Sequence, residues 1–470
     1  MKNISKIILG TVFAGMALSS CTSDLTDLNI DPKHPTVLPS ANLMAKGQQQ
    51  QFYYTYTGSV NYNNFKFFTQ MWAETTYTDE TNYDIVTRNQ PRNNFNVMYN
   101  GVLNNYEQAK KNLVAEGGDA NKMATLEIAE ISAWETIVDT YGDVPYTQAL
   151  QASTGQFAPA YDDAKSIYTD LFKRINAVIP TITAGTGYSE DLVYGGDMMK
   201  WKKLANSIKL RLALNLDDTD HATAKAAGEA AYASGLMTSD ADSYALAFPG
   251  GLFSNPLFDD LIASGRKDFV PSELVVNMMN AKMDPRRPMY FTTVGGAYVG
   301  GVFGDGNPYP NYSHYQETTW LQPTAPATLL SYTEVLFMLT EAAARGYSVG
   351  GTADTWYKMA VTNSMNEYGV AAGDTSAYLL AHPYDAANWK KSIGEEAYIA
   401  LHNRGFAEWN FSRRLDYPVF VNPTNSRLDG VPVRMPYSDQ EYVLNKGNVT
   451  AAASKIGGDK ATTKLFWDKF

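Results

Sequence analysis

Cysteine is nearly absent from this sequence: Cys21 is the only one among 470 residues. A single cysteine cannot form an internal disulfide, and a free thiol is a liability in an oxidising compartment. Because no second cysteine exists, thiolate metal sites are excluded as well. Cys21 must therefore have another use.

Catalytic and metal-binding signatures are also missing. The five histidines show no pair at the three- or four-residue spacing of a helical metal site; they are His34, His221, His314, His382 and His402. There is no nucleotide-binding glycine loop, no zinc-protease motif and no serine-hydrolase elbow. We therefore predict a protein that is not an enzyme, with no cofactor and no metal. Aspartate and glutamate number 49, so a glycosidase carboxylate pair stays open as an alternative.

Positive charge is scarce. Lysine and arginine total 38, which leaves a net charge of −11. This balance argues against nucleic acid, whose phosphates require a basic surface. No apolar run reaches the roughly 18 residues of a membrane-spanning helix.

The N-terminus has the order of a signal peptide. Lys2 and Lys6 precede an apolar stretch at 7–18, which is too short to span a bilayer but long enough for a signal-peptide core. The sequence Leu18-Ser19-Ser20-Cys21 resembles the lipobox read by lipoprotein signal peptidase. We therefore predict that residues 1–20 are removed and that Cys21 is lipidated.

The residues after Cys21 are polar and acidic as far as Pro32. We interpret residues 21–40 as a tether between the lipid and the folded body. The remaining chain, 41–470, is predicted to be a single domain.

Helical periodicity dominates the body. Apolar residues recur at three- and four-residue spacing in 164–179, 198–216, 331–346 and 353–368. The last two, separated by Gly350-Gly351, form a hairpin about as long as a tetratricopeptide repeat of 34 residues. The segments 125–150 and 162–180 suggest another pair. The sequence therefore predicts a mainly α fold, an α–α superhelix of tetratricopeptide-like helix pairs.

Two stretches lack this period, at 185–197 and 284–328. Both are rich in glycine and tyrosine, and disordered segments are poor in aromatic residues. Long irregular stretches in compact proteins are often functional. We predict a loop-rich ligand face there.

Several motifs occur in a fixed order along the chain. They are the turn 141–146, the stretch 191–197 with 200–207 and 210–213, Asp268-Phe269, Asp284-Pro285-Arg286, 341–346, 407–410 with Arg413-Arg414, and the ending Phe466-Trp467-Asp468. Together they resemble the SusD-like branch of the SusD/RagB family of nutrient-uptake outer-membrane lipoproteins. The resemblance spans most of the mature chain. These motifs lie in predicted helices and turns, so we interpret them as structural.

The resemblance implies a lipid-anchored protein of the outer membrane, exposed at the cell surface. It implies a partner, a TonB-dependent transporter resembling SusC, to which the protein delivers its ligand. Family ligands are mostly glycans, and some members take peptides. We expect oligosaccharide capture, with oligopeptide capture or a surface glycoside hydrolase as alternatives.

Aromatic residues make up 13% of the chain, including 31 tyrosines. Tyrosine and tryptophan offer a flat apolar face for the C–H face of a sugar and a polar group for its hydroxyls. In the family, ring platforms arise from loops in comparable regions. The candidate ligand-binding residues are Trp72, Tyr77 and Tyr83 in one cluster and Tyr309, Tyr312, Tyr315 and Trp320 in the other, with Asn82 and Arg88 as possible hydrogen-bond partners.

Overall fold

The computed structural model describes residues 38–469. Contacts divide the chain into Met1–Pro39 and Ser40–Phe470, and every element described below belongs to the second unit. That unit is mainly helical, which confirms the predicted fold class. The predicted signal peptide, Cys21 and the tether as far as residue 37 lie outside the described residues.

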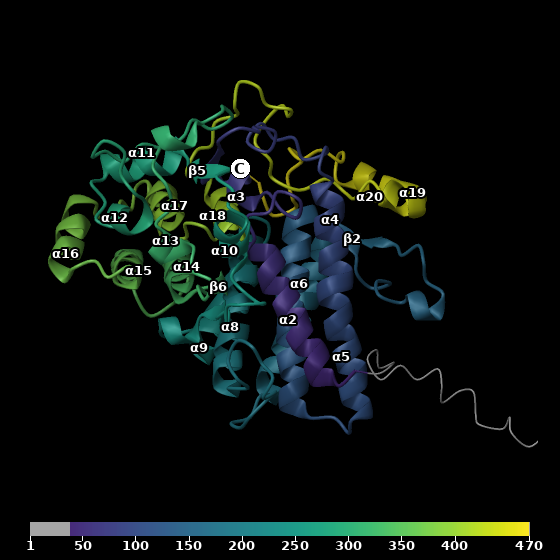
Figure 1. Ribbon diagram of the computed structural model, residues 1–470. Helices are drawn as coiled ribbons and strands as arrows, with labels where there is room; N and C mark the ends of the chain where they lie inside the picture. Colours follow the sequence, from purple (N-terminus) through teal and green to yellow (C-terminus); the bar gives the residue numbers. More distant parts are fainter. Residues whose placement is uncertain (1–37, 470) are drawn as a thin grey trace, which may run out of the picture. The chain divides into compact units, whose positions relative to one another are not determined.

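Consecutive helices pack in pairs, as the sequence predicts (Figure 1). The pairs are α6 (Ala120–Tyr141) with α7 (Ala164–Val178), α8 (Met198–Leu216) with α9 (His221–Ser234), α14 (Tyr332–Ala344) with α15 (Ala353–Glu367), and α17 (Trp389–Ala400) with α18 (Gly405–Leu415).

Side-chain caps and glycines set the ends of these helices. At the start of α8, the Asp197 carboxylate accepts hydrogen bonds from the next free backbone N–H groups, and Thr352 does the same for α15. Gly369, with φ of +69°, follows α15 where a left-handed residue is needed. The four predicted helices agree with the structure to within two residues. The predicted segment 125–150 differs, because α6 begins at Ala120 and ends at Tyr141, where the following Gly142, with φ of +85°, stops the helix.

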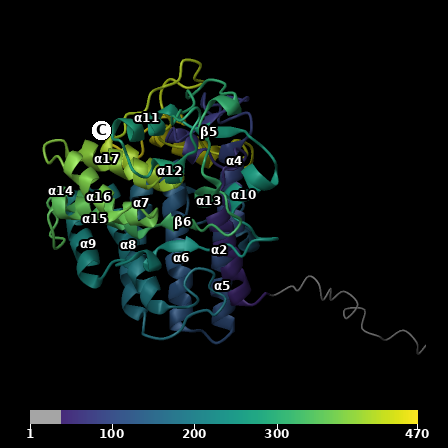
Figure 2. The same cartoon turned by 60° about the vertical axis from the view of Figure 1, so that its left-hand side comes forward.

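The same unit contains further α-helices. They are α2 (Ser40–Tyr56), α3 (Phe65–Phe68), α4 (Gln90–Asn96), α5 (Asn104–Ala115), α10 (Pro256–Phe258), α11 (Glu273–Ala281), α12 (Arg287–Tyr290), α13 (Glu317–Trp320), α16 (Ala372–Ala381), α19 (Glu441–Leu444) and α20 (Lys446–Lys455). In both views α2, α5 and α6 run side by side, and α2 packs on α5 (Figures 1 and 2).

Within residues 38–469 the strands are short and form three antiparallel pairs. They are β1 (Trp72–Glu74) with β5 (Phe269–Pro271), β2 (Val144–Pro145) with β3 (Tyr161–Asp162), and β4 (Tyr244–Leu246) with β6 (Ala327–Leu330). In the first pair Glu74 lies opposite Phe269. This ladder joins segments nearly 200 residues apart in the sequence, and the candidate ligand-binding face forms at its end.

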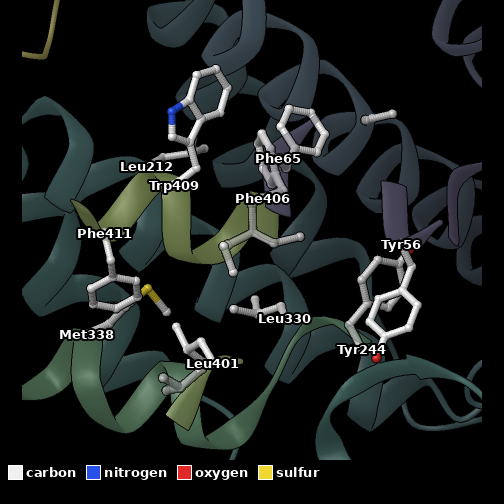
Figure 3. Close-up of a cluster of buried hydrophobic side chains, with 14 of the residues drawn as sticks. Tyr56, Phe65, Leu212, Tyr244, Leu330, Met338, Leu401, Phe406, Trp409 and Phe411 are labelled. Atoms are coloured by element: carbon white, nitrogen blue, oxygen red, sulfur yellow. The ribbon is translucent and has the colours of Figure 1, made fainter. Parts of the chain in front are cut away.

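One aromatic cluster joins the N-terminal helices to α18. Figure 3 shows Phe406 and Trp409 of α18 reaching toward Phe65 of α3, and the Phe65 and Trp409 ring centroids are 5.5 Å apart. Phe411, on the same helix, lies beside Met338 of α14. The cluster is buried, so it fixes α3 and the following strand β1 against the helix pairs.

Buried ion pairs connect one helix pair to the next. Arg211 of α8 contacts Glu135 of α6 at 2.6 Å and Glu334 of α14 at 3.3 Å. Arg414 of α18 contacts Glu341 of α14 at 2.8 Å. Arg211, Glu341 and Arg414 belong to the family-like motifs, and their burial gives these three residues a structural role.

The predicted irregular stretches are largely irregular in the structure. Residues 185–197 form turns, and 284–328 contain only α12, α13, one 3₁₀ turn at Tyr309–Asn311 and the start of β6. Within residues 38–469, no helix is both long and apolar enough to cross a membrane.

Candidate ligand-binding face

Four of the seven predicted aromatic residues are buried. Trp72 and Tyr83 have no exposed surface, and Tyr315 and Trp320 are 4% and 6% exposed. The prediction that these four are ring platforms is therefore wrong for the structure as it stands, because a stacked sugar needs an open ring face.

The buried rings are held by hydrogen bonds from their polar atoms. The Trp72 indole N–H donates to Asn403 Oδ1 at 2.6 Å, and the Tyr315 hydroxyl donates to the Met71 carbonyl at 3.2 Å. The Trp320 ring lies edge-on to Tyr290 at 5.2 Å. These contacts are those of core aromatic residues.

The remaining three predicted residues are accessible. Tyr77 is 70% exposed, and Tyr309 and Tyr312 are partly exposed. Tyr77 follows β1, and Tyr309 begins the 3₁₀ turn after Pro308. Tyr77 and Tyr309 each line one of the two cavities described next, and Tyr312 lines neither.

Two neighbouring cavities open at the end of the β1–β5 ladder. One, of about 300 Å³, is lined by Tyr77 together with Glu74, Glu80 and Arg88. The other, of about 340 Å³, is lined by Tyr309, His314 and Tyr315. Arg266 and Phe269 line both cavities, so the two are adjacent. We call this joint surface the tyrosine face. It lies where β5 appears in the upper part of both views (Figures 1 and 2).

Two buried carboxyl groups form the floor of the Tyr77 cavity. The backbone N–H and hydroxyl of Thr81 donate to Glu74 Oε2 at 2.9 and 2.8 Å. Arg88 donates to Glu80 at 2.5 Å. Burial, together with a hydrogen bond to the Glu80 carboxylate, raises the pKa of Glu74 to about 9. At neutral pH the Glu74 carboxyl is therefore protonated.

This pair predicts a pH-dependent stability. The folded protein holds the Glu74 proton more tightly than the unfolded chain, so the stabilisation is complete below pH 4.5 and is lost as the pH rises toward 9. Glu74→Gln replaces the protonated acid by a neutral amide that can make the same hydrogen bonds. We expect the melting temperature of the variant to fall less than that of the wild type between pH 5 and 9.

The exposed carboxyl of Glu317 offers a control, since Glu317→Gln should leave that slope unchanged. Equal slopes in the wild type and Glu74→Gln would show that the pair carries no proton in this range.

The predicted hydrogen-bonding residues have different surroundings. Arg88 lines the Tyr77 cavity and is partly exposed, so its guanidinium can contact a ligand while it also contacts Glu80. Asn82 is 6% exposed, and its amide donates to the carbonyls of Thr78 and Gly304. Asn82 therefore secures the loop around Gly304 and is not a ligand contact in this structure.

Tyr309 is the better-fixed ring platform. The His314 imidazole stacks on it with centroids 3.7 Å apart and an interplanar angle of 9°. His314 Nε2 lies 2.8 Å from the Tyr309 carbonyl, which can only accept, so this nitrogen carries the hydrogen. The stack holds the ring in one orientation before any ligand arrives, which reduces the entropy cost of binding.

A third and larger cavity of about 840 Å³ lies between α11 and the loops 302–305 and 421–424. Its only ring is Phe303, apart from the His382 imidazole. Asp305 is an exposed residue in the lining of this cavity. Within residues 38–469, no three histidine, cysteine, aspartate or glutamate side chains lie close enough together to bind a metal ion. This cavity lacks the ring platforms that distinguish the tyrosine face.

Comparisons with known proteins agree with this architecture. Residues 32–438 match the SusD-like family described as "Starch-binding associating with outer membrane". This chain belongs to the SusD-like family. No curated protein is similar enough in sequence to count as a relative.

Solved structures share the fold over nearly the whole chain. A chitin-binding protein is 27% identical with a TM-score of 0.82, covering 92% of this chain and 100% of its own. A SusD homologue from Bacteroides ovatus is 22% identical, with a TM-score of 0.80 and coverage of 92% and 99%. A chitin-binding SusD homologue from Flavobacterium johnsoniae is 22% identical, with a TM-score of 0.79 and coverage of 92% and 98%. The last two show the fold alone.

The sequence-based prediction missed several residues of the tyrosine face. They are Glu74, Glu80, Arg266, Lys267, Phe269 and His314. Phe269 belongs to a motif quoted above for the family resemblance, and the basic pair Arg266-Lys267 precedes it by two residues. A basic dipeptide beside a family motif, in a chain of net charge −11, was the available signal.

Proposed function

We propose that this protein binds an oligosaccharide at the tyrosine face and delivers it to a TonB-dependent outer-membrane transporter resembling SusC. A lipid on Cys21 would hold it to the outer membrane at the cell surface. The observation that carries the proposal is the pair of adjacent cavities, each lined by one accessible tyrosine. Membership in a family described as starch-binding supports a glycan ligand, and the 27% identical chitin-binding protein makes chitin oligosaccharides the first to test.

The expected affinity is modest. A ring that removes on the order of 40–60 Å² of sugar surface from water contributes about 1–1.5 kcal/mol. Micromolar binding corresponds to about −8 kcal/mol. Two rings therefore supply only part of the binding free energy, and polar groups around the cavities must supply the rest.

Removing the fixed platform should weaken binding. We expect Tyr309→Ala to raise the dissociation constant for a bound oligosaccharide about tenfold, equivalent to about 1.4 kcal/mol. Its melting temperature should change little, because the ring is partly exposed. Isothermal titration calorimetry on the chain lacking residues 1–21 measures the affinity.

Tyr384→Ala is the matched control, since Tyr384 is also partly exposed and lines neither cavity. Unchanged affinity in both Tyr309→Ala and Tyr77→Ala would place the ligand elsewhere. Binding of oligopeptides in place of every oligosaccharide tested would favour the peptide alternative.

We expect no cleavage of bound oligosaccharide. A retaining glycosidase needs two carboxyl groups about 5–5.5 Å apart, and an inverting one needs them farther apart. Glu74 and Glu80 instead lie in hydrogen-bond contact and are 3% and 1% exposed. Product analysis after long incubation should return the oligosaccharide intact, and hydrolysis proportional to protein concentration would restore the hydrolase alternative.

A further inference from the structure

The Tyr309 cavity is locally basic although the chain as a whole is acidic. Arg266 and Lys267 line it, and both are exposed. The carboxylates nearest to them are few: Glu317 lines the same cavity, and Asp268 lies 3.9 Å from Arg266. Within residues 38–469, Lys267 forms no ion pair. The cavity therefore has two cations for one lining carboxylate, in a protein of net charge −11.

The other two cavities lack this excess of positive charge. The Tyr77 cavity is lined by two arginines, the Glu80 and Asp268 carboxylates and the protonated Glu74, and Arg88 is engaged by Glu80. The 840 Å³ cavity is lined by three acidic side chains and Lys282, which contacts Glu396 at 2.7 Å. Among the lysines and arginines that line the three cavities, Lys267 is the one without an ion pair, and it lines only the Tyr309 cavity.

The Lys267 ammonium covers the platform itself. Its nitrogen lies 5.3 Å from the Tyr309 ring centroid. The stacked His314 ring lies 3.7 Å from the same centroid and covers one face of Tyr309. We infer that the Lys267 ammonium lies over the opposite face, the one on which a sugar would stack.

Because Lys267 lies over the ring, the charge of a ligand should affect how strongly it binds at Tyr309. A neutral sugar that stacks on Tyr309 must displace Lys267 and lose the cation–π contact without an ionic replacement. A sugar bearing an anionic group at the edge of the ring offers Lys267 and Arg266 a partner, so the ammonium moves from the ring face to the anion. When Lys267 moves to the anionic group, the Tyr309 ring face becomes open for stacking and the anion gains an ionic partner.

We propose that the Tyr309 cavity selects a saccharide carrying an anionic substituent, a carboxylate or a sulfate ester, which Lys267 and Arg266 bind while the sugar ring stacks on Tyr309. This inference rests on the proposed function, because it assumes that the ligand is a saccharide. It goes beyond that function by assigning the charge of the ligand and two residues that determine specificity.

Two tetrasaccharides of equal length test the proposal. One consists only of N-acetylglucosamine and is neutral, and the other alternates N-acetylglucosamine with glucuronate and carries two carboxylates. Wild-type protein should bind the anionic tetrasaccharide about tenfold more tightly at low salt. That preference should shrink as ionic strength is raised to about 0.5 M, because exposed charges are screened.

Lys267→Met should change the two affinities in opposite directions. Anionic binding should weaken about fivefold, whereas neutral binding should strengthen about twofold to fivefold because the ring face is no longer covered. Arg266→Gln should weaken anionic binding only. Lys122→Met is the matched control: the Lys122 nitrogen lies 5.3 Å over the Tyr188 ring, outside the tyrosine face, and its loss should change neither affinity.

The outcomes separate the two proposals. Equal wild-type affinities, with Lys267→Met weakening both or neither, would overturn the charge selection while oligosaccharide binding stands. Binding of neither tetrasaccharide, nor of any other glycan in a wider array, would overturn the proposed function itself. Because Lys267 is exposed, each variant is expected to keep the wild-type melting temperature, which circular dichroism confirms before titration.

Discussion

Trp72→Ala is expected to lower the free energy of unfolding by about 3–5 kcal/mol, the range for emptying a large aromatic site in a core. Trp72 has no exposed surface and packs against Phe269 and Tyr315, with ring centroids 4.9 and 5.4 Å away. The change also removes the indole donor from Asn403, whose side chain would keep an unpartnered buried oxygen. Chemical denaturation followed by circular dichroism measures the loss.

The structure offers a control for this prediction in Trp389, which is partly exposed at the start of α17. Trp389→Ala should cost clearly less than Trp72→Ala. A Trp72→Ala protein that melts normally but binds oligosaccharide poorly would restore Trp72 as a ring platform and contradict the assignment of this residue to the core.

Cys21→Ala is expected to move the protein from the membrane fraction to the soluble fraction. Each buried methylene contributes about 0.8 kcal/mol, so a single acyl chain binds reversibly and two or more anchor stably. The net charge of −11 offers no electrostatic substitute for the lipid on an anionic surface. Because the helical body begins at Ser40, the variant should keep the melting temperature of the processed wild type.

Metabolic labelling with a palmitate analogue tests the same change directly. The wild type and a Ser23→Ala control should be labelled, and Cys21→Ala should not be. Equal labelling of Cys21→Ala would refute the lipobox prediction, and an unlabelled wild type would show that an ordinary signal peptide precedes an incidental cysteine.

Local chemistry explains why the helix pairs were predictable. Apolar spacing fixes the buried side of each helix, and side-chain caps such as Asp197 or glycines such as Gly369 fix its ends. Both signals act over a few residues. The end of α6 was predicted less accurately. It depends on the positive φ of Gly142, which the periodicity of the neighbouring residues does not show.

The candidate site was only partly predictable, because burial is decided by contacts between distant segments. Trp72 and Tyr77 are five residues apart in one aromatic cluster, yet Trp72 lies in β1, where every residue is buried, and Tyr77 lies just beyond it. The partner strand is β5, almost 200 residues later. Likewise, the position of Lys267 over Tyr309 depends on two loops that the sequence leaves unconnected.

The most direct test of the account is a crystal structure of the chain lacking residues 1–21 with a bound oligosaccharide. We expect one sugar ring to lie against the open face of Tyr309, with Lys267 displaced from that face. The rest of the oligosaccharide should continue past Arg266 toward Tyr77. Oligosaccharide bound in the 840 Å³ cavity beside α11, with Tyr77 and Tyr309 uncovered, would contradict it.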